Sequence, residues 1–378
     1  MNWYEAEALV LVTVLGVYFL DRWEQKYLKK LFDWVPAVLL AYVIPAVVSY
    51  VLKVDYSAHS IHSFSKLFFI PLAIVAVMSS LSFAQLKAIG FKPIILFFFG
   101  SAIIALAPVV FTGFFLGSDF VQNTLISQGY WKGIPPIVGS WIGGSTSQLV
   151  LKELVQTEES LFLQVLVMDT VLVNIWTILM FQTIKKSSAL NRFFKVEDVA
   201  MPLPIVTRKG KALSGFWVML ILVAAVLAVD FLAPTFVAKV LLLSVIGLGI
   251  SNFIPTWNFK FVLRLGGILI IVVMAVLGLK LQIDHFSVQP AFLVFLCGWL
   301  FLHFIGMLWV AKLLNLHLAW VPIASMANVG GIATAPAVTA AYEKKWMPHA
   351  IVLAILSMAT GTFWGMGTIW LFEILFGL

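Results

Sequence analysis

The stretch that decides the fold is Ile134-Pro135-Pro136-Ile137-Val138-Gly139-Ser140-Trp141-Ile142-Gly143-Gly144-Ser145-Thr146-Ser147, with a glycine pair inside a run without charged residues. A second stretch aligns with it at a constant offset of 187 residues: Val321-Pro322-Ile323-Ala324-Ser325-Met326-Ala327-Asn328-Val329-Gly330-Gly331-Ile332-Ala333-Thr334. The alignment places Pro135 on Pro322 and Gly143-Gly144 on Gly330-Gly331. One motif at two places predicts an internal duplication.

Further matches keep the same order along the chain. Pro93 and Pro290 each open a long apolar run at an offset of 197, and Val77-Met78 matches Val273-Met274 at an offset of 196. Differences in loop length account for the drift in offset. Repeats of inverted topology are a common construction of secondary transporters, and we favour inversion here.

The amino-acid composition is that of a protein embedded in a membrane. Of its 378 residues, 62% are hydrophobic and 11% are charged, whereas a soluble domain has about 25% charged residues. A helix needs about 20 apolar residues to cross a bilayer. We expect an all-α polytopic membrane protein with about 12 (10–13) transmembrane helices. The count combines eight long charge-free runs with four further apolar segments, 8–20, 161–184, 215–238 and 265–279; the eight runs are 34–52, 67–86, 93–118, 133–151, 240–259, 286–311, 313–342 and 346–372.

A basic hydrophilic segment, 185–213, lies at the middle of the chain. Its prolines, Pro202 and Pro204, argue against one continuous helix, and its charge places it on the cytoplasmic side. We expect a first transmembrane repeat over 1–184, this linker over 185–213, and a second repeat over 214–378. Strict alternation of spans conflicts with the loop charges, so one crossing of the first half is miscounted, either around 118–133 or as a re-entrant segment.

Both glycine pairs interrupt apolar segments and have polar neighbours. Glycine unwinds a helix at little steric cost, and backbone groups freed within a bilayer need protein or a wet cavity around them. Broken helices would present a half-helix N-terminus to an anion and free carbonyl oxygens to a cation. Close packing of small residues is the alternative explanation. We favour a substrate or ion site formed by Gly143, Gly144, Ser145, Thr146, Gln148, Asn328, Gly330, Gly331 and Thr334.

Asp169 is an acid inside the apolar segment 161–184, where its insertion is unfavourable by about 2.5–3.5 kcal/mol at the centre of a lone helix. Asn174 and two threonines follow it along one helix face. A carboxylate with amide and hydroxyl oxygens suits Na⁺, and a carboxylate alone can carry a proton. We expect Asp169 to be the coupling residue, with Asn174 at the same site and Asp169 and Asn328 as candidate Na⁺ ligands. A purely structural aspartate is the alternative.

Other features carry less functional information. His303 is interpreted as a structural histidine, and the face of the last span that includes Ser357, Gly361 and Gly365 as a packing surface. The lone cysteine, Cys297, excludes internal disulfides. The net charge of +7 fits loops beside anionic lipids rather than nucleic-acid binding. Enzyme motifs such as H-E-x-x-H, G-x-S-x-G and the P-loop are absent, so we do not expect an enzyme.

The two glycine-containing strings resemble the signatures of the YjcL-like family of bacterial membrane proteins, a group without an agreed function. That family is similar to cation:proton antiporters and bile-acid sodium symporters. The resemblance implies two crossing discontinuous helices, about 134–151 and 320–342, a separate scaffold or dimerisation domain, and elevator-type alternating access. Antiporters of this grouping use adjacent acids after the first crossing helix, where this chain has only Met168-Asp169-Thr170. This departure favours sodium-coupled uptake over antiport.

We therefore expect a multi-pass secondary active transporter of the inner (plasma) membrane that couples Na⁺, or protons, to a small organic solute. The dipoles of the half-helices favour an anionic solute. Its partners would be membrane lipids, the solute and a second copy in a homodimer, and no cofactor is expected beyond a coupling Na⁺. A cation:proton antiporter that uses Asp169 is the first alternative. A non-transporting membrane scaffold or receptor is the second.

Overall fold

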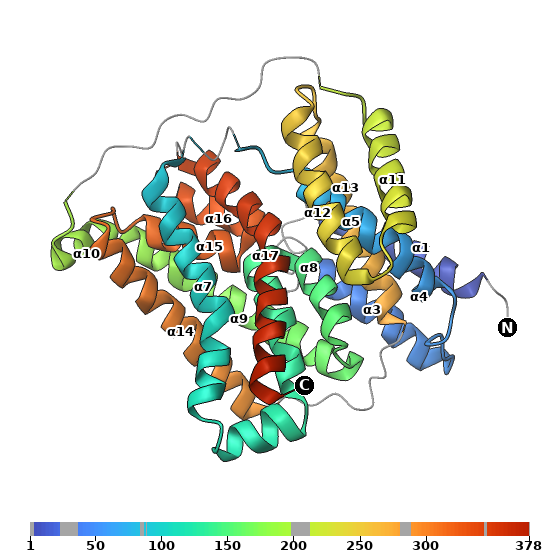
Figure 1. Cartoon of the computed structure of the whole chain (residues 1–378), viewed down its shortest axis with the longest axis horizontal. Coiled ribbons are helices and arrows are strands. Elements are labelled where there is room, and N and C mark those ends of the chain that lie inside the picture. The colour runs from blue at the N-terminus through green and yellow to red at the C-terminus, as the bar shows by residue number, and fades with distance from the viewer. Residues whose placement is uncertain are drawn as a thin grey trace. The chain divides into compact units, whose positions relative to one another are not determined.

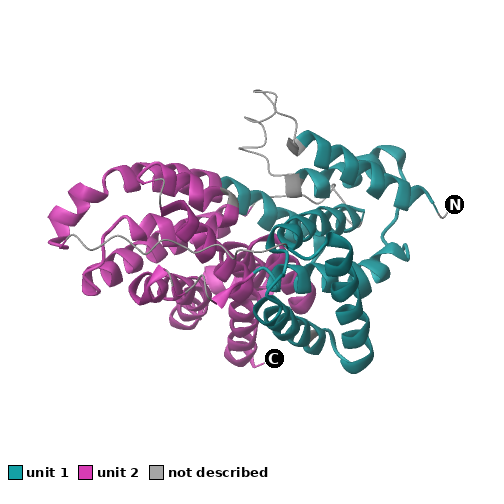
Figure 2. Ribbon diagram, turned by 90° about the horizontal axis from the view of Figure 1, so that it is seen from above, with its two compact units in different colours: residues 1–80, 157–171, 210–288 teal, residues 81–156, 172–209, 289–378 magenta. Residues whose placement is uncertain are grey.

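The structure is a computed structural model, and all regular elements in the residues that it describes are helices. The chain divides into two compact units, each of which draws on both halves of the sequence (Figure 2). Unit 1 comprises residues 1–80, 157–171 and 210–288, and unit 2 comprises 81–156, 172–209 and 289–378. The described residues are 4–22, 37–83, 87, 89–197, 212–279, 289–343 and 346–377.

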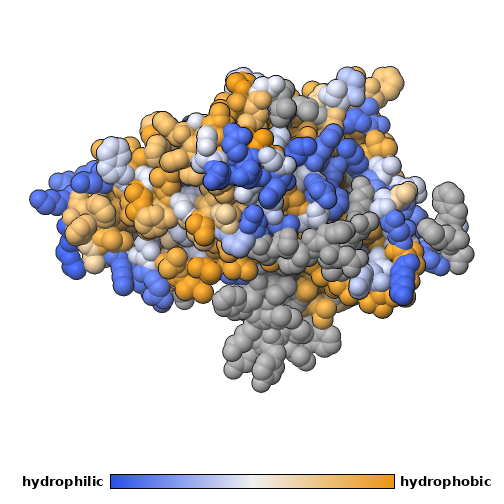
Figure 3. Space-filling model, turned by 90° about the horizontal axis from the view of Figure 1, so that it is seen from below, coloured by the Kyte–Doolittle hydropathy of each residue, from blue (hydrophilic) through white to orange (hydrophobic). Residues whose placement is uncertain are grey.

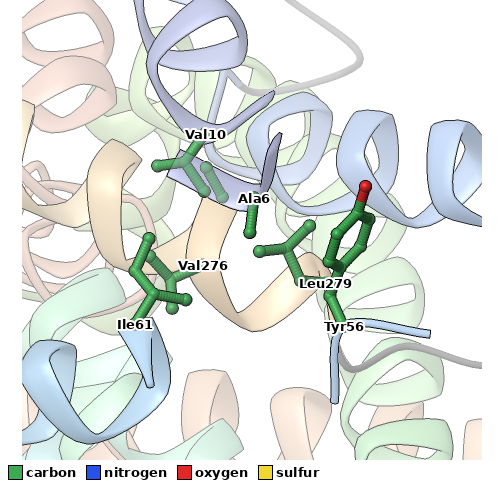
Figure 4. Close-up of a cluster of buried hydrophobic side chains, with 7 residues drawn as sticks. Ala6, Val10, Tyr56, Ile61, Val276 and Leu279 are labelled. Carbon is green, nitrogen blue, oxygen red and sulfur yellow. The ribbon is translucent and has the colours of Figure 1, made fainter. Parts of the chain in front are cut away.

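Unit 1 is organised around α13, which packs against α1, α3 and α5 (Figure 1). Close approach is possible because Gly278, at the end of α13, has no side chain to separate it from the backbone of Tyr42 on α3. Apolar side chains from α1, α4, the end of α13 and the α3–α4 connection form one buried cluster, drawn in Figure 4. The helices are α1 (Glu5–Arg22), α3 (Ala37–Leu52), α4 (Ile61–Phe64), the π-helical η1 (Ser65–Phe69), α5 (Ile70–Met78), α11 (Gly215–Leu232), α12 (Phe236–Phe253), α13 (Phe259–Gly278) and the first part of α9 (Glu159–Lys185).

Unit 2 is organised around α17, whose 30 residues correspond to a length of about 45 Å. α17 packs against α7, α8, α15 and α16, and this arrangement is clear in Figure 1. The elements are α7 (Phe91–Phe114), the short helices η2 (Phe120–Ser127) and η3 (Tyr130–Gly133), α8 (Ile134–Val155), the rest of α9, α10 (Ser187–Phe194), α14 (Pro290–Leu313), α15 (Trp320–Val329), α16 (Gly331–Ala340) and α17 (Met347–Phe376).

Seven continuous helical segments of the described residues are long and apolar enough to cross a membrane, and one of them joins α4, η1 and α5. Large apolar side chains remain exposed on them, for example Phe114, Phe231 and Val294, and Figure 3 shows hydrophobic residues over much of the face that it presents. The chain is thus a multi-pass helical membrane protein, as predicted, whereas the range of 10–13 spans stays a prediction. The seven are Ile61–Met78, Phe91–Phe114, Glu159–Lys185, Gly215–Leu232, Phe259–Gly278, Pro290–Leu313 and Met347–Phe376.

The predicted linker 185–213 is only partly covered by the structure. Its first part forms the short helix α10, and the backbone N–H of Leu318 donates to Asn191 Oδ1 on that helix over 2.9 Å. Pro202 and Pro204 lie outside the described residues. The division into repeats over 1–184 and 214–378 stays a prediction.

Candidate functional site: two hairpins that meet on α17

α8 is a helical hairpin rather than a straight helix. Gly144 interrupts it with φ +71° and ψ −169°, a backbone region that is essentially limited to glycine. A methyl group on Gly139 would lie 2.8 Å from the carbonyl carbon of Ser147 and 2.9 Å from the nitrogen of Gln148. Residues eight apart in a straight helix are separated by about 12 Å. The chain therefore turns back at Gly143-Gly144, and we call residues 134–155 hairpin 1.

α15 and α16 form a second hairpin, with Gly330-Gly331 at its tip. Gly331 has φ +66°, and the two helices pack against each other. The ends of the segment meet: Tyr342 Oη lies 3.2 Å from His317 Nε2, and the rings of Trp320 and Trp346 stack with 4.9 Å between centroids. A straight helix of this length would hold its ends about 30 Å apart. We call residues 320–340 hairpin 2.

The two hairpins enter unit 2 from opposite ends of α17. At the base of hairpin 1, the ring of Trp131 lies 5.6 Å from that of Phe376, near the C-terminal end of α17. At the base of hairpin 2, the ring of Trp320 lies 6.4 Å from that of His349, in the first turn of α17. The glycine tips point towards one another from these two bases.

The helices that precede the hairpins also run in opposite directions. Phe111, near the end of α7, packs on Phe295, near the start of α14, with 5.1 Å between ring centroids. Gly100, earlier on α7, lies against His303, later on α14. α7 and α14 are therefore antiparallel neighbours, and each leads into a hairpin whose base lies at the end of α17 that the helix approaches.

The structure corrects one part of the sequence prediction. The two helices are discontinuous at the predicted glycine pairs, but they double back and do not cross as straight, broken spans. The runs 133–151 and 313–342 are thus hairpins rather than single spans, because a left-handed glycine permits reversal and small residues let the two arms pack. The loop charges left two explanations for the miscounted crossing of the first half, a span around 118–133 or a re-entrant segment. The reversal of α8 matches the second, while the number of spans stays a prediction.

Ser357 joins the two tips. Its hydroxyl lies within hydrogen-bonding reach of the Ile142 carbonyl oxygen, which precedes the tip of hairpin 1. The same hydroxyl lies 3.2 Å from Oδ1 of Asn328, which precedes the tip of hairpin 2. One side chain on α17 therefore contacts both hairpins.

The face of α17 that contains Ser357 is also the predicted packing surface. Gly361 lies against the backbone of Gly143, and Gly365 lies against Leu151 of the second arm of hairpin 1. Thr362 Oγ1 donates to Ser147 Oγ over 3.0 Å. The prediction that these small residues serve close packing inside the protein is confirmed.

A chain of hydrogen bonds connects the first arm of hairpin 2 to α7, α9 and α14. Nδ1 of the buried His303 lies 3.1 Å from the Gly100 carbonyl oxygen, which only accepts, so Nδ1 carries the proton. Nε2 then accepts from Ser325 Oγ over 3.1 Å, and Ser325 Oγ accepts from Trp176 Nε1 over 3.0 Å. Both ring nitrogens have partners, in line with the interpretation of His303 as structural.

Three predicted site residues have buried polar atoms without a hydrogen-bond partner. These atoms are Thr146 Oγ1 and Gln148 Nε2, in the second arm of hairpin 1, and Thr334 Oγ1, in α16. Thr146 and Gln148 are more than nine-tenths buried. Buried polar groups are rarely left unpaired, so such atoms beside both tips are what a site for a polar ligand would leave.

The remaining predicted site residues are distributed as follows. Gly143, Gly144 and Ser145 form the tip of hairpin 1, and Gly330 and Gly331 form that of hairpin 2. Asn174 is half-buried on the part of α9 that belongs to unit 2.

Asp169 is 7% exposed and lies on the part of α9 that belongs to unit 1. It shares a buried row of that helix with Leu172 and Trp176, whereas Asn174 belongs to a half-buried face. The structure thus unites the glycine-flanking residues in unit 2, and Asp169 is assigned to the other unit.

Sequence reasoning missed two hydroxyls that contact Asn328. Ser101 was not singled out, and Ser357 was interpreted only as a packing residue. Each is a lone small polar side chain within a charge-free run, next to a glycine or on a glycine-rich face. That pattern gives a weak signal, because buried serines usually bond to their own helix backbone.

Membrane-length helices define a multi-pass membrane protein, and two opposed helical hairpins meet on one of them, α17. The chain belongs to the family described as "Protein of unknown function (DUF819)", which matches residues 8–209 and 259–374. No curated protein matches the chain.

Proposed function

We propose that the protein is a secondary active transporter of the inner (plasma) membrane that couples Na⁺, or protons, to the movement of a small organic solute by elevator-type alternating access. The observation that carries this proposal is the meeting of two opposed hairpin tips at Ser357. Re-entrant backbone within a bilayer is tolerated where it is buried in protein or lines a cavity, and discontinuous helices form the sites of many transporters.

The depth of the meeting point supports a transport site. Gly361, which touches the tip of hairpin 1, is the fifteenth of the 30 residues of α17. It therefore lies near the middle of a helix that is longer than the hydrocarbon core, which is about 30 Å thick. Binding sites of secondary transporters lie near the bilayer midplane.

The opposite directions of α7 with hairpin 1 and of α14 with hairpin 2 support an inverted duplication. The left-handed glycines, Gly144 and Gly331, are separated by the same 187 residues as the aligned motifs. Two copies of opposite orientation give the site an equivalent element on each side of the membrane.

The chemistry around the tips suits a polar solute, and we favour an anion. After each glycine pair a half-helix begins whose first N–H groups lack partners within the helix and carry partial positive charge. Thr146, Gln148 and Thr334 add hydroxyl and amide groups with unused hydrogen-bonding capacity.

The antiporter alternative rests on Asp169 and on the similarity of the YjcL-like family to cation:proton antiporters. The carboxylate of Asp169 could bind and release the coupled proton within the membrane. The alternative differs in its cargo, because it exchanges ions and moves no organic solute. The scaffold or receptor alternative predicts neither flux.

The first test of this proposal measures the thermal unfolding of the purified protein in detergent, in NaCl and in choline chloride at equal ionic strength. Wild type is compared with Asp169→Asn and with the matched control Asp230→Asn. Asp230, which is half-exposed near the C-terminal end of α11, forms an ion pair with Lys239 of α12. A Na⁺-specific rise in the unfolding temperature of wild type that Asp230→Asn retains supports sodium coupling, and its loss in Asp169→Asn would assign the coupling to Asp169.

Proteoliposomes with an imposed Na⁺ gradient then test flux with a panel of small carboxylates. Accumulation that collapses with the gradient supports the proposal. Na⁺ or K⁺ exchange against protons without solute uptake indicates the antiporter, and the absence of any flux overturns the transporter proposal.

A further inference from the structure

A cluster of buried oxygen atoms surrounds Asn328. Its amide oxygen, Oδ1, lies 3.0 Å from Ser101 Oγ of α7 and 3.2 Å from Ser357 Oγ of α17. All three side chains are at most 1% exposed. Asn328 Nδ2 donates to the Phe97 carbonyl oxygen over 3.3 Å, which fixes the orientation of the amide and turns Oδ1 towards the hydroxyls.

Each hydroxyl in this cluster has a second acceptor within reach. Ser101 Oγ lies 3.1 Å from the Phe97 carbonyl oxygen, and Ser357 Oγ contacts the Ile142 carbonyl oxygen. A hydroxyl has one proton and two acceptor lone pairs. If both protons turn to the backbone carbonyls, Oδ1 and the two Oγ atoms have lone pairs that face one another with no hydrogen between them.

We propose that Asn328 Oδ1, Ser101 Oγ and Ser357 Oγ form a binding site for Na⁺, completed by the Ile142 carbonyl oxygen at the tip of hairpin 1. This inference rests on the proposed transport function and deepens it by assigning the coupling ion to residues other than Asp169. Hard cations prefer oxygen ligands, and a Ca²⁺-sized ion such as Na⁺ is held at roughly 2.3–2.6 Å. Asn328 Oδ1 lies 3.0 Å from one hydroxyl oxygen and 3.2 Å from the other, a spacing that suits neighbouring ligands of such an ion.

The charge of the site selects a monovalent ion. All four oxygens are neutral, whereas Ca²⁺ sites use carboxylates and Mg²⁺ retains several waters. A neutral, buried oxygen cluster therefore suits Na⁺ better than a divalent cation.

The position of the site gives the ion a role in coupling. Ser101 belongs to α7, Asn328 to hairpin 2 and Ile142 to hairpin 1, and Ser357 connects them from α17. An ion bound to these oxygens holds both tips in the arrangement described here. A solute that needs both tips in place binds more tightly when the ion is present.

The test measures thermal stabilisation by Na⁺ as a function of its concentration, with choline replacing Na⁺, for the full-length purified protein. Ser101→Ala is compared with the matched control Ser244→Ala. Both serines are buried in a helix and bond to the carbonyl four residues earlier, but Ser244 lies in unit 1. We expect Ser101→Ala to raise the half-maximal Na⁺ concentration at least tenfold and Ser244→Ala to leave it unchanged.

Ser357→Ala is a second, independent variant with the same expected loss, and Ca²⁺ as probe should give no specific stabilisation. An equal Na⁺ response in Ser101→Ala and Ser244→Ala overturns the site. A Na⁺ response that only Asp169→Asn removes also overturns it, but leaves sodium coupling intact. The absence of any stabilisation of wild type by Na⁺ also overturns the proposed site. The flux measured in proteoliposomes decides separately whether the protein is a transporter.

Discussion

Gly143 at the tip of hairpin 1 and Gly361 at the middle of α17 are packed backbone to backbone: a methyl group on Gly143 would lie 2.9 Å from the Cα of Gly361. No side chain separates the re-entrant tip from the helix that supports it. The position of the tip therefore depends on the absence of a Cβ at both residues.

Gly361→Ala should displace the tip of hairpin 1. The new methyl group would overlap the backbone of Gly143, and overpacking of this kind typically destabilises a protein by about 1–3 kcal/mol. Gly367, on the same helix, has open space around its Cα, so Gly367→Ala should leave stability equal or slightly higher. Thermal unfolding of both variants in detergent measures the difference. Equal midpoints would contradict the close packing of the tip.

Gly144→Ala should destabilise hairpin 1 through its backbone alone. A Cβ at Gly144 would meet nothing within 4 Å, but its φ and ψ belong to a region that costs other residues about 1–3 kcal/mol. Gly298, which also has free space, lies in the regular helix α14, and Gly298→Ala is the control. A Gly144→Ala protein as stable as Gly298→Ala would show that the chain does not reverse at this residue.

Trp176→Phe should weaken the support of hairpin 2. The substitution removes the indole N–H that donates to Ser325 Oγ, a loss of about 0.5–1.5 kcal/mol for a neutral hydrogen bond. Trp370→Phe, at a position that is 61% exposed, controls for the change of residue type at the surface, and the contribution of the hydrogen bond is separated from the lost buried volume by a second substitution. In a double-mutant cycle with Ser325→Ala, the effects should be non-additive. Strictly additive effects would exclude the hydrogen bond.

Both ends of each hairpin should be accessible from one side of the membrane only. Cysteines at Lys132 and Gln156, which flank hairpin 1, should react with an impermeant maleimide from the same side, in a Cys297→Ser background. Cysteines at Lys312 and Tyr342, which flank hairpin 2, should react from the opposite side. Labelling in vesicles of both orientations measures this. Opposite sidedness within either pair would restore the crossing-helix prediction.

The sequence alone predicts where the helices break and much of what surrounds the breaks. A glycine pair among apolar residues is a local signal, and both Gly144 and Gly331 adopt the left-handed conformation that only such a residue tolerates well. The packing face of α17 was equally predictable, because Gly361 and Gly365 recur at helical spacing.

The angle of each break could not be predicted. A positive φ permits either a bend or a reversal, and the outcome depends on whether the two arms fit together. For hairpin 1 the fit depends on Gly139, whose Cα approaches the backbone of Ser147 and Gln148. This is a contact within the tertiary fold that no periodicity encodes. The contacts of Ser101 and Ser357 with Asn328 likewise join residues that are far apart in the sequence.

Because the tips of both hairpins are glycines, no side chain at the tips can be changed to alter what they contact. At Gly143-Gly144 and Gly330-Gly331, whatever approaches meets peptide groups, which are the same in every protein. In the proposed transporter, a change of preferred solute would therefore come from flanking positions such as Thr146, Gln148 and Thr334, while the four glycines stay fixed. On the proposed function, backbone groups at the tips would bind the solute, and side chains about one turn away would select it.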